Sequence, residues 1–440
     1  MSSASGLAGT RESGPLRAAR SWTRATFKSL NMRNYRLFFI GQAISLSGTW
    51  MQSVAQSWLV LKLTNSGSAL GTVVALQFLP VLLLAPYGGV LADRFSKRRL
   101  LFFTQGAAAS LALTLGALVA TDVVRLWMVY VIALLLGTVN ALDNPTRQSF
   151  VHELVGAKTL RNAVTLNSLE VNLSRVIGPA IAGVLIAKVG LAPCFILNGL
   201  SYFAVLWCLW RMTGTQLHLT PLVRAAKGQI REGFAYVRHD PLIMDVLVMM
   251  AIVGTLTYEF QVTLPLLAKF TFHGDASSYA MLTSATGVGA VIGGLLMAGR
   301  RTATVKGLTL AVLGFGATMI AVALSPTMLV AMLGMVVVGV FSISFTSLTN
   351  TILQLQAPPT MRGRVMSLWT VAFLGSTLFG APIVGWIGEN IDPRWSIATG
   401  GIAALAAAGV GVHALSAGRQ AKHRSVQVDA PSMTQKEDCA

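Results

Sequence analysis

Twelve apolar windows, each about 20 residues long, constrain the fold of this chain more than any other feature. A helix of that length crosses the hydrocarbon core of a bilayer, which is about 30 Å thick. Lipid offers the backbone no hydrogen bonds and the windows lack strand-like alternation, so each should be a helix. The windows cover residues 37–61, 69–91, 100–120, 126–146, 164–187, 192–210, 242–264, 278–298, 307–325, 327–351, 365–387 and 395–416.

The composition agrees with a lipid environment. Hydrophobic residues make up 54% of the chain and charged residues only 11%, against about 25% charged in soluble domains. The predicted fold is therefore an all-α integral membrane protein. A polar stretch divides the windows six and six, and its segment "GQIREGFAYVRHD" predicts an amphipathic helix. The expected organisation is a basic cytoplasmic tail (1–33), an N-terminal six-helix bundle (34–211), a cytoplasmic connector (212–240), a C-terminal six-helix bundle (241–416) and a disordered cytoplasmic tail (417–440).

Basic residues predict the orientation of the chain. If both ends lie inside, 28 of the 34 lysines and arginines fall in cytoplasmic segments, as the positive-inside rule requires. We therefore expect a multi-pass protein of the plasma (inner) membrane with both termini in the cytoplasm. The net charge of +18 fits anionic lipid headgroups, so no nucleic-acid partner is expected.

The two halves of the chain resemble each other. "TLRNAVTLNSL" (159–169) returns as "TMRGRVMSLWT" (360–370), and "GPAIAGVLI" (178–186) returns as "GAPIVGWIG" (380–388). Both matches lie about 200 residues apart, which indicates a duplicated six-helix unit. Pseudo-symmetric halves around a connector are typical of alternating-access transporters, whose substrate binds near the membrane midplane.

The segment "GGVLADRFSKRRLL" (88–101) separates the second apolar window from the third and contains a cluster of charged residues. It resembles the signature of the major facilitator superfamily between its second and third helices, with Gly89, Asp93, Arg94, Lys97 and Arg98 in register. "NPTRQSFV" (144–151) and the residues from Leu160 to Gly183 resemble the drug/proton-antiporter-like branch that contains the enterobactin exporter and macrolide efflux proteins. The resemblance covers roughly residues 35–416.

This resemblance implies a conformational latch at the cytoplasmic side. In the family, the acid corresponding to Asp93 contacts the start of the eleventh helix, here Arg364–Met366, and a basic residue that corresponds to Arg147. A carboxylate is stabilised at a helix N-terminus, so the contact would hold that side shut. The alternative interpretation is that the basic residues only fix the topology.

Charged residues inside apolar windows are costly, so each is a candidate for function. Glu170 shares a helix face with Asn167 and is the first candidate for the proton-coupling residue. Arg175 shares a face with Asn172 and is either a functional residue or a tether to a neighbouring helix. Two further acids are candidates: Asp143 caps a helix break or joins the latch, and Glu259 is the second candidate for proton coupling.

Two other groups of residues stand out. Amide and aromatic side chains in the windows are expected to line a cavity for amphipathic cargo: Gln42, Trp50, Gln56, Gln77 and Asn140. Glycine and proline in the repeated segments favour close packing and a helix kink: Gly178, Pro179, Gly183, Gly380 and Gly385. Those of the fifth window, Gly178, Pro179 and Gly183, resemble a pattern of the family's antiporters, which favours export; the alternative is packing alone.

The predicted function is secondary active transport. The sequence lacks a nucleotide-binding loop, so energy should come from a proton gradient or another cation gradient. We expect a monomer that exports a hydrophobic or amphipathic small molecule, such as a drug, siderophore or secondary metabolite, without a metal or cofactor. The alternatives are uptake, lipid movement, and a membrane sensor or scaffold. An integral-membrane enzyme would need a metal cluster or a nucleophile–histidine pair, and the sequence indicates neither.

The orientation can be tested on Cys439, because Cys194 and Cys208 lie in one apolar window. A membrane-impermeant maleimide should leave Cys439 unmodified in intact cells and modify it in inside-out vesicles. An Asp122→Cys variant, in the expected external turn, is the reverse control. Modification of Cys439 in intact cells would contradict the predicted orientation.

Overall fold

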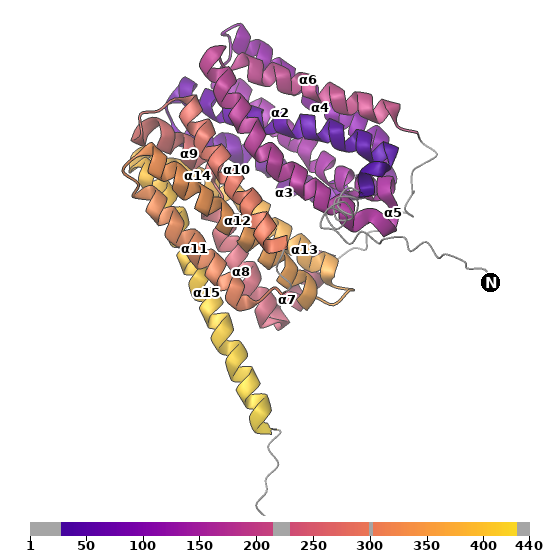
Figure 1. Ribbon diagram of the computed structural model, residues 1–440, viewed down its shortest axis with the longest axis vertical. Coiled ribbons are helices and arrows are strands. Elements are labelled where there is room, and N and C mark those ends of the chain that lie inside the picture. Colours follow the sequence, from indigo (N-terminus) through magenta and orange to yellow (C-terminus); the bar gives the residue numbers. More distant parts are fainter. Residues whose placement is uncertain (1–27, 214–228, 299–301, 429–440) are drawn as a thin grey trace, which may run out of the picture.

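A computed structural model describes residues 28–213, 229–298 and 302–428; within its helices, the side chains of 85–94, 157–158, 161, 229–231, 233 and 417–428 lie outside the description. Most described residues are helical and form two bundles (Figure 1). The N-terminal bundle contains η1 (Lys28–Asn31), α2 (Arg33–Thr64), α3 (Gly67–Arg94), α4 (Lys97–Ala120), α5 (Leu126–Lys188) and α6 (Ala192–Arg211).

The connector contributes α7 (Gln229–His239), where the sequence predicts an amphipathic helix. The C-terminal bundle follows it. Its elements are α8 (Pro241–Leu256), α9 (Phe260–Leu266), η3 (Leu267–Thr271), α10 (Ala276–Ala298), α11 (Val305–Ala323), α12 (Met328–Gln356), α13 (Arg362–Thr370), η4 (Val371–Gly375), α14 (Thr377–Asn390) and α15 (Pro393–Val428).

The predicted fold class is confirmed. Within the described residues, eleven helical segments are long and apolar enough to cross a membrane. The twelfth expected span, 37–61, lies in α2, whose 32 residues extend about 48 Å at about 1.5 Å per residue. This helix carries buried glutamines and serines, so it is long enough to span but less apolar than the others.

Three predicted spans contain interruptions. α5 joins the fourth and fifth spans across Gly156, whose φ of 64° and ψ of 174° favour glycine strongly. The seventh span consists of α8, α9 and η3, and its α-helix is broken at Thr257–Glu259. The eleventh consists of α13, η4 and α14, where η4 is a wider helical turn. Such turns in α-helices are frequent at functional sites.

The helix packing follows the internal repeat. α3 packs on α14, and α10 packs on α5, so that each bundle contributes its second and fifth spans to the interface. Gly178 of α5 lies against Ser47 and Trp50 of α2, while Gly380 of α14 lies against Thr255 of α8. These equivalent contacts, between the fifth and first spans and between the eleventh and seventh, reflect the duplicated unit that the sequence predicts.

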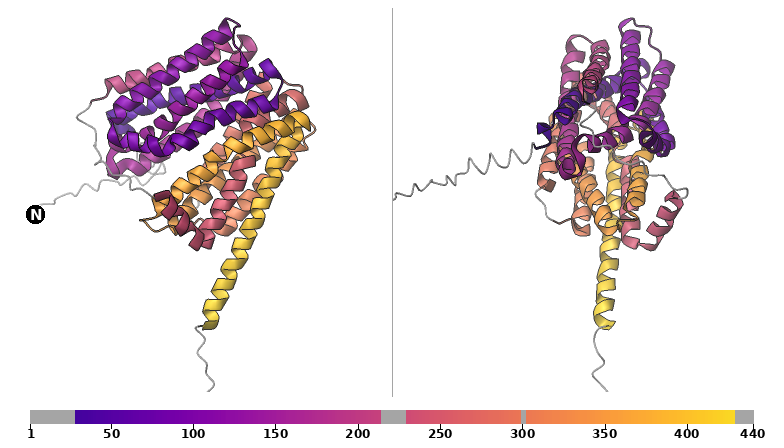
Figure 2. Two further views of the ribbon diagram at one scale, coloured as in Figure 1. Left: turned by 180° about the vertical axis from the view of Figure 1, so that it is seen from behind. Right: turned by 90° about the vertical axis from the view of Figure 1, so that its right-hand side faces the viewer.

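The bundles are closest at one end of the molecule. They meet at the end that holds the α2–α3 turn, here named the junction end, and diverge toward the end that holds α7, here named the connector end (Figures 1 and 2). At the junction end the backbones touch, because Gly67 lies against the Gly385 carbonyl and Gly71 against the Ala381 carbonyl. Only small residues allow such an approach.

A carboxylate from the C-terminal bundle caps α3 at the junction end. Glu389 of α14 accepts hydrogen bonds of 2.8 Å from the Ser66 hydroxyl and from the Ser68 backbone N–H. An anion at a helix N-terminus interacts favourably with the helix dipole. Glu389 therefore holds the beginning of α3 to the C-terminal bundle.

A cation from the same bundle caps α2. The Lys269 ammonium of η3 donates to the Leu61 carbonyl at 2.9 Å and to the Asn65 side-chain oxygen at 2.6 Å. Asn65 ends α2 in a left-handed conformation with φ of 54°. A cation at a helix C-terminus complements the dipole there, so both sides of the α2–α3 turn are bound by charges of the matching sign.

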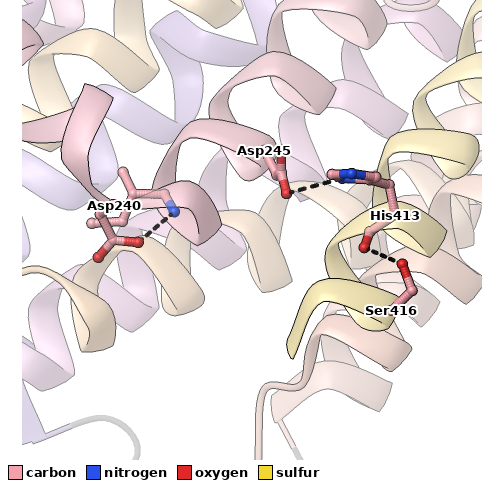
Figure 3. A network of polar contacts seen from close by, with 5 residues as sticks. Asp240, Asp245, His413 and Ser416 are labelled. Carbon is pink, nitrogen blue, oxygen red and sulfur yellow. Dashed lines mark hydrogen bonds and ion pairs between the residues drawn. The ribbon is translucent and has the colours of Figure 1, made fainter. Parts of the chain in front are cut away.

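At the connector end, polar contacts order the beginning of the C-terminal bundle (Figure 3). The Asp240 carboxylate accepts from the Ile243 N–H at 3.1 Å and caps α8. Asp245 of α8 lies 3.9 Å from the His413 ring of α15, and the Ser416 hydroxyl donates to the His413 carbonyl. These contacts place α8 beside α15 at the side where α7 enters the bundle.

The C-terminal tail differs from the sequence-based expectation. α15 continues to Val428, whereas disorder is expected from residue 417. The segment "AGRQAKHRSVQV" contains good helix formers, and adding residues to an existing helix avoids the cost of nucleation. Residues 429–440 of the expected disordered tail, and 1–27 of the expected basic tail, lie outside the described residues.

The backbone contact at the junction end predicts a large effect of Gly385→Leu. A side chain there meets the Gly67 carbonyl, and overpacking typically costs about 1–3 kcal/mol. We expect a melting temperature several degrees lower in nanodiscs. Gly409→Leu is the matched control, because nothing lies within 4 Å of its added Cβ. Equal melting temperatures for the two variants would contradict the interpretation.

Candidate functional site

A cavity of about 110 Å³, lined mostly by residues with polar side chains, lies among α2, α3, α5 and α6 of the N-terminal bundle, with one lining residue from α9 of the C-terminal bundle. The lining residues that the structure describes are uncharged. They are Thr49, Trp50, Gln52, Ser53, Gln56, Ser57, Val73, Val74, Gln77, Leu136, Asn140, Asn198, Tyr202 and Gln261. Such a cavity offers many neutral hydrogen-bonding groups to a ligand or to water.

Hydrogen bonds position part of this lining. The Asn198 amide donates to the Gln52 side-chain oxygen at 2.7 Å, and the hydroxyls of Thr49 and Tyr202 lie 3.3 Å apart. Because buried polar groups are costly without partners, these bonds order the side of the cavity formed by α2 and α6. The other amides of the lining are Gln56 of α2, Gln77 of α3, Asn140 of α5 and Gln261 of α9.

The sequence identifies four of the lining residues: Trp50, Gln56, Gln77 and Asn140. Gln42 instead lies near Arg147, whose guanidinium donates to its side-chain oxygen at 3.5 Å. Sequence reasoning missed Gln52, Asn198 and Gln261. Gln52 and Gln56 are four residues apart on one helix face, which is a signal that was available. No comparable local signal connects Asn198 or Gln261 to α2.

Arg175 lies on the interface between the bundles, near the middle of the fifth span (Asn162–Lys188) in the C-terminal half of α5. Its guanidinium carbon is 4.8 Å from the centre of the Trp50 ring, within the range of a cation–π interaction. Its backbone carbonyl is close to Gly287 of α10 in the C-terminal bundle. The Nε atom is buried and has no hydrogen-bond partner. Trp50 thus borders both Arg175 and the cavity.

Glu170 is buried closer to the connector end, with 5% of its surface exposed. Its Oε1 atom has no hydrogen-bond partner, and Arg147 interacts with it electrostatically. Arg147 also donates to the Asn144 side chain at 3.2 Å and to Gln42, whose Nε2 atom is itself unpartnered. Glu170, Arg147 and Gln42 therefore form an incompletely satisfied polar cluster inside the N-terminal bundle.

Asn167 and Asn172, which the sequence places on the same helix faces as Glu170 and Arg175, form no hydrogen bond with these charged side chains among the described contacts. The Asn172 side chain donates to the Ser168 carbonyl of its own helix at 2.8 Å. Asn167 is half-buried on α5. Ser174, on the same face as Glu170, accepts from the Ser47 hydroxyl of α2 at 3.3 Å, which ties the fifth span to the first.

Glu259 lies at the break in the seventh span and is 2% exposed. Its neighbours belong to α14: Thr377 is its hydrogen-bonding partner, and a Cβ on Gly380 would lie 3.1 Å from its Oε1. That oxygen has no hydrogen-bond partner. A buried carboxyl group at an interrupted helix has the arrangement expected of an ion or proton site in a transporter.

Three other buried charged residues, Asp143, Lys97 and Glu153, have close polar partners within the N-terminal bundle. Asp143 accepts from the Thr104 hydroxyl at 2.6 Å and from the Gln105 amide at 2.9 Å. Lys97 pairs with Glu153 at 2.7 Å, with side chains only 8% and 6% exposed. These contacts join α4 to α5, so both groups have a structural explanation.

The latch predicted from the sequence is only partly within the described residues. Gly89 and the side chains of Asp93 and Arg94 lie outside the part of the chain whose side chains the structure describes. Lys97 binds Glu153, and Arg98 donates to the Trp210 carbonyl at 3.0 Å, so both bind inside their own bundle.

The glycine and proline residues predicted to pack helices lie at close contacts. Gly183 is near Ala280 of α10, and its carbonyl accepts from the Ser277 hydroxyl at 3.0 Å. Gly178 and Gly380 face the first and seventh spans, and Gly385 faces Gly67. Pro179 lies inside α5, next to Gly178.

Comparison with known proteins gives a consistent result. The chain is 26% identical over 372 residues to the enterobactin exporter EntS of Citrobacter koseri, covering 83% of this chain and 88% of that protein. It is 31% identical over 176 residues to the staphyloferrin A transporter of Staphylococcus aureus, covering 40% and 44%. A bacterial homologue of the lysosomal transporter Spinster, solved in an inward-facing and occupied conformation, has the same fold with a TM-score of 0.68 at 15% identity, covering 90% and 96%.

The family match covers nearly the whole molecule. Residues 24–436 match the transmembrane secretion effector family. The relatives are membrane transporters and not enzymes. The chain, a multi-span membrane transporter, therefore belongs to the transmembrane secretion effector family of the major facilitator superfamily.

Proposed function

We propose that this transporter exports an amphipathic small molecule of the siderophore class in exchange for protons. The observation that carries the proposal is the pair of membrane-buried carboxyl groups, Glu170 and Glu259, each with an unpartnered oxygen. Ionisable groups held in this way within a membrane span are typical of proton pathways. The relatives named for enterobactin and staphyloferrin A support the substrate class and the direction.

The arrangement of the bundles supports an alternating-access cycle. The count of basic residues assigns the connector end to the cytoplasm, where the bundles diverge (Figure 2). The junction end, closed by the α3–α14 contact, then faces the outside. Cargo would enter from the cytoplasm and leave after the junction end separates and the connector end closes.

Proton binding at Glu259 would act directly on the helices that close the junction end. Glu259 contacts α14 through Thr377 and Gly380, and α14 forms the backbone contact with α3 through Gly385. Loss of the carboxylate charge would change how the broken seventh span packs on α14. Glu170 would act at the other end of the pathway, since its charge state determines how strongly Arg147 is held.

The connector end contains a partner for the proposed latch. Arg364, at the start of α13, pairs with Glu232 of α7 at 2.8 Å; the Arg364 side chain is 25% exposed and that of Glu232 is 58% exposed. In this conformation the guanidinium is therefore bound by a carboxylate of the connector, which Asp93 would have to replace. We propose that Asp93 binds the beginning of α13 when the connector end closes, where the helix dipole would also favour it.

Removal of either carboxyl charge should uncouple transport from protons. In proteoliposomes that contain purified protein, Glu170→Gln and Glu259→Gln should lower pH-driven efflux of the cargo at least tenfold, while exchange of cargo without a gradient persists. Asp122→Asn is the matched control: Asp122 is exposed, and its φ of 55° suits asparagine. Unchanged pH-driven efflux in both glutamine variants would contradict proton coupling through these residues.

The latch predicts that Asp93→Asn slows turnover and leaves folding intact. The uncharged amide would bind the α13 terminus more weakly, so the closed connector end would be populated less. We expect severalfold slower efflux with normal membrane insertion, measured by flux in inverted vesicles and by quantitative blotting. Wild-type turnover would refute the latch, and flux in the opposite direction would favour uptake instead of export.

A further inference from the structure

Arg175 is a cation near the middle of the fifth span, and no ion pair among the described residues includes it. An isolated charge within a membrane span is expensive and is retained when it binds something. Among the described residues the ion pairs are Lys97–Glu153, Arg364–Glu232 and His413–Asp245, and none includes Arg175. Stacking on Trp50 satisfies one face of the guanidinium, but the Nε–H remains buried and unpartnered.

The nearest candidates for a counter-charge are engaged elsewhere. Glu170 is five residues earlier on α5, about 140° around the helix, and faces Arg147. Glu259 lies against Thr377 and Gly380 of α14. The Tyr258 hydroxyl donates to the Ser342 carbonyl at 2.8 Å, so it is neutral and already bonded. Among the described residues, one guanidinium donor of Arg175, the Nε–H, is therefore left without a partner.

The cavity beside Trp50 is suited to an acidic ligand. Its lining residues within the described chain are uncharged and provide amide and hydroxyl donors, including Gln77 and Asn140. Trp50 adds a flat aromatic surface: it lines the cavity, and the centre of its ring lies 4.8 Å from the guanidinium carbon of Arg175, which is next to the cavity lining and not part of it. A guanidinium, neutral donors and an aromatic face together recognise a planar molecule that carries an oxyanion.

We propose that Arg175 binds an oxyanion of the cargo, so that the exported molecule is an acidic aromatic amphiphile and not a neutral or cationic drug. This assignment rests on the proposed export function. Trp50 supports the planar part of the ligand, and the amides around it bind the remaining polar groups. The planar fork of the guanidinium binds carboxylates in two-point fashion, so a lysine at this position would recover only part of the preference.

The test uses two probes that differ in charge, 2-naphthoate and 2-naphthamide, with the full-length protein in nanodiscs. Wild-type protein should bind naphthoate at least tenfold more tightly than naphthamide. Arg175→Gln should abolish that preference while naphthamide affinity stays within twofold, which also shows that the variant is folded. Arg125→Gln, a change at an exposed arginine, should keep the full preference.

The proposal is overturned if the preference survives in Arg175→Gln, or if wild-type protein does not prefer naphthoate. If Arg175→Gln fails to fold, Arg175→Lys gives the result: a reduced preference supports the proposal, and an unchanged preference overturns it. Flux in proteoliposomes separates the two claims. Arg175-dependent binding of naphthoate without pH-driven flux refutes proton-coupled export only. If naphthamide is transported by a pH gradient and the protein shows no preference for naphthoate, only the role of Arg175 is refuted.

Discussion

The contact between the backbones of α3 and α14 determines how the rest of this molecule is arranged. Gly67 and Gly71 face Gly385 and Ala381, and no larger side chain would allow the helices to come so close. Glu389 and Lys269 add charges matched to the ends of the helices they cap. Because these contacts lie at the junction end, the bundles are held together there and diverge toward the connector end (Figure 2).

The buried charges fall into two groups that differ in how well they are satisfied. Asp143 and the Lys97–Glu153 pair have close partners between α4 and α5, as structural charges should. Glu170, Glu259 and Arg175 each keep a buried polar atom without a partner. The second group lies on the spans that form the bundle interface or the broken helix. Incomplete satisfaction, more than burial, therefore distinguishes the candidates for function.

Much of the fold follows from local sequence, because a membrane span must be apolar over a fixed length. The twelve windows, the helix of the connector and the duplicated packing of Gly178 and Gly380 could all be read from the chain. The break at Thr257–Glu259 could not, because its surroundings are as apolar as an intact span. The extension of α15 was missed because its polar composition resembles that of a disordered tail.

The candidate site was predictable only where a residue is costly by itself. Trp50, Gln77 and Glu259 stand out because amide, aromatic or charged groups interrupt apolar windows. The partners of these residues depend on contacts between distant helices. Only the three-dimensional structure therefore shows that Lys97 pairs with Glu153 and that Gln261 lies beside α2.

The lone guanidinium of Arg175 also has an electrical consequence. Bacterial cells maintain a voltage that is negative inside, and each elementary charge crossing 100 mV is worth about 2.3 kcal/mol. An anion carried outward moves in the direction that this voltage favours, as does a proton carried inward. Exchange of the two would be electrogenic, so that the voltage could drive expulsion of an acidic cargo even when the interior and exterior have the same pH.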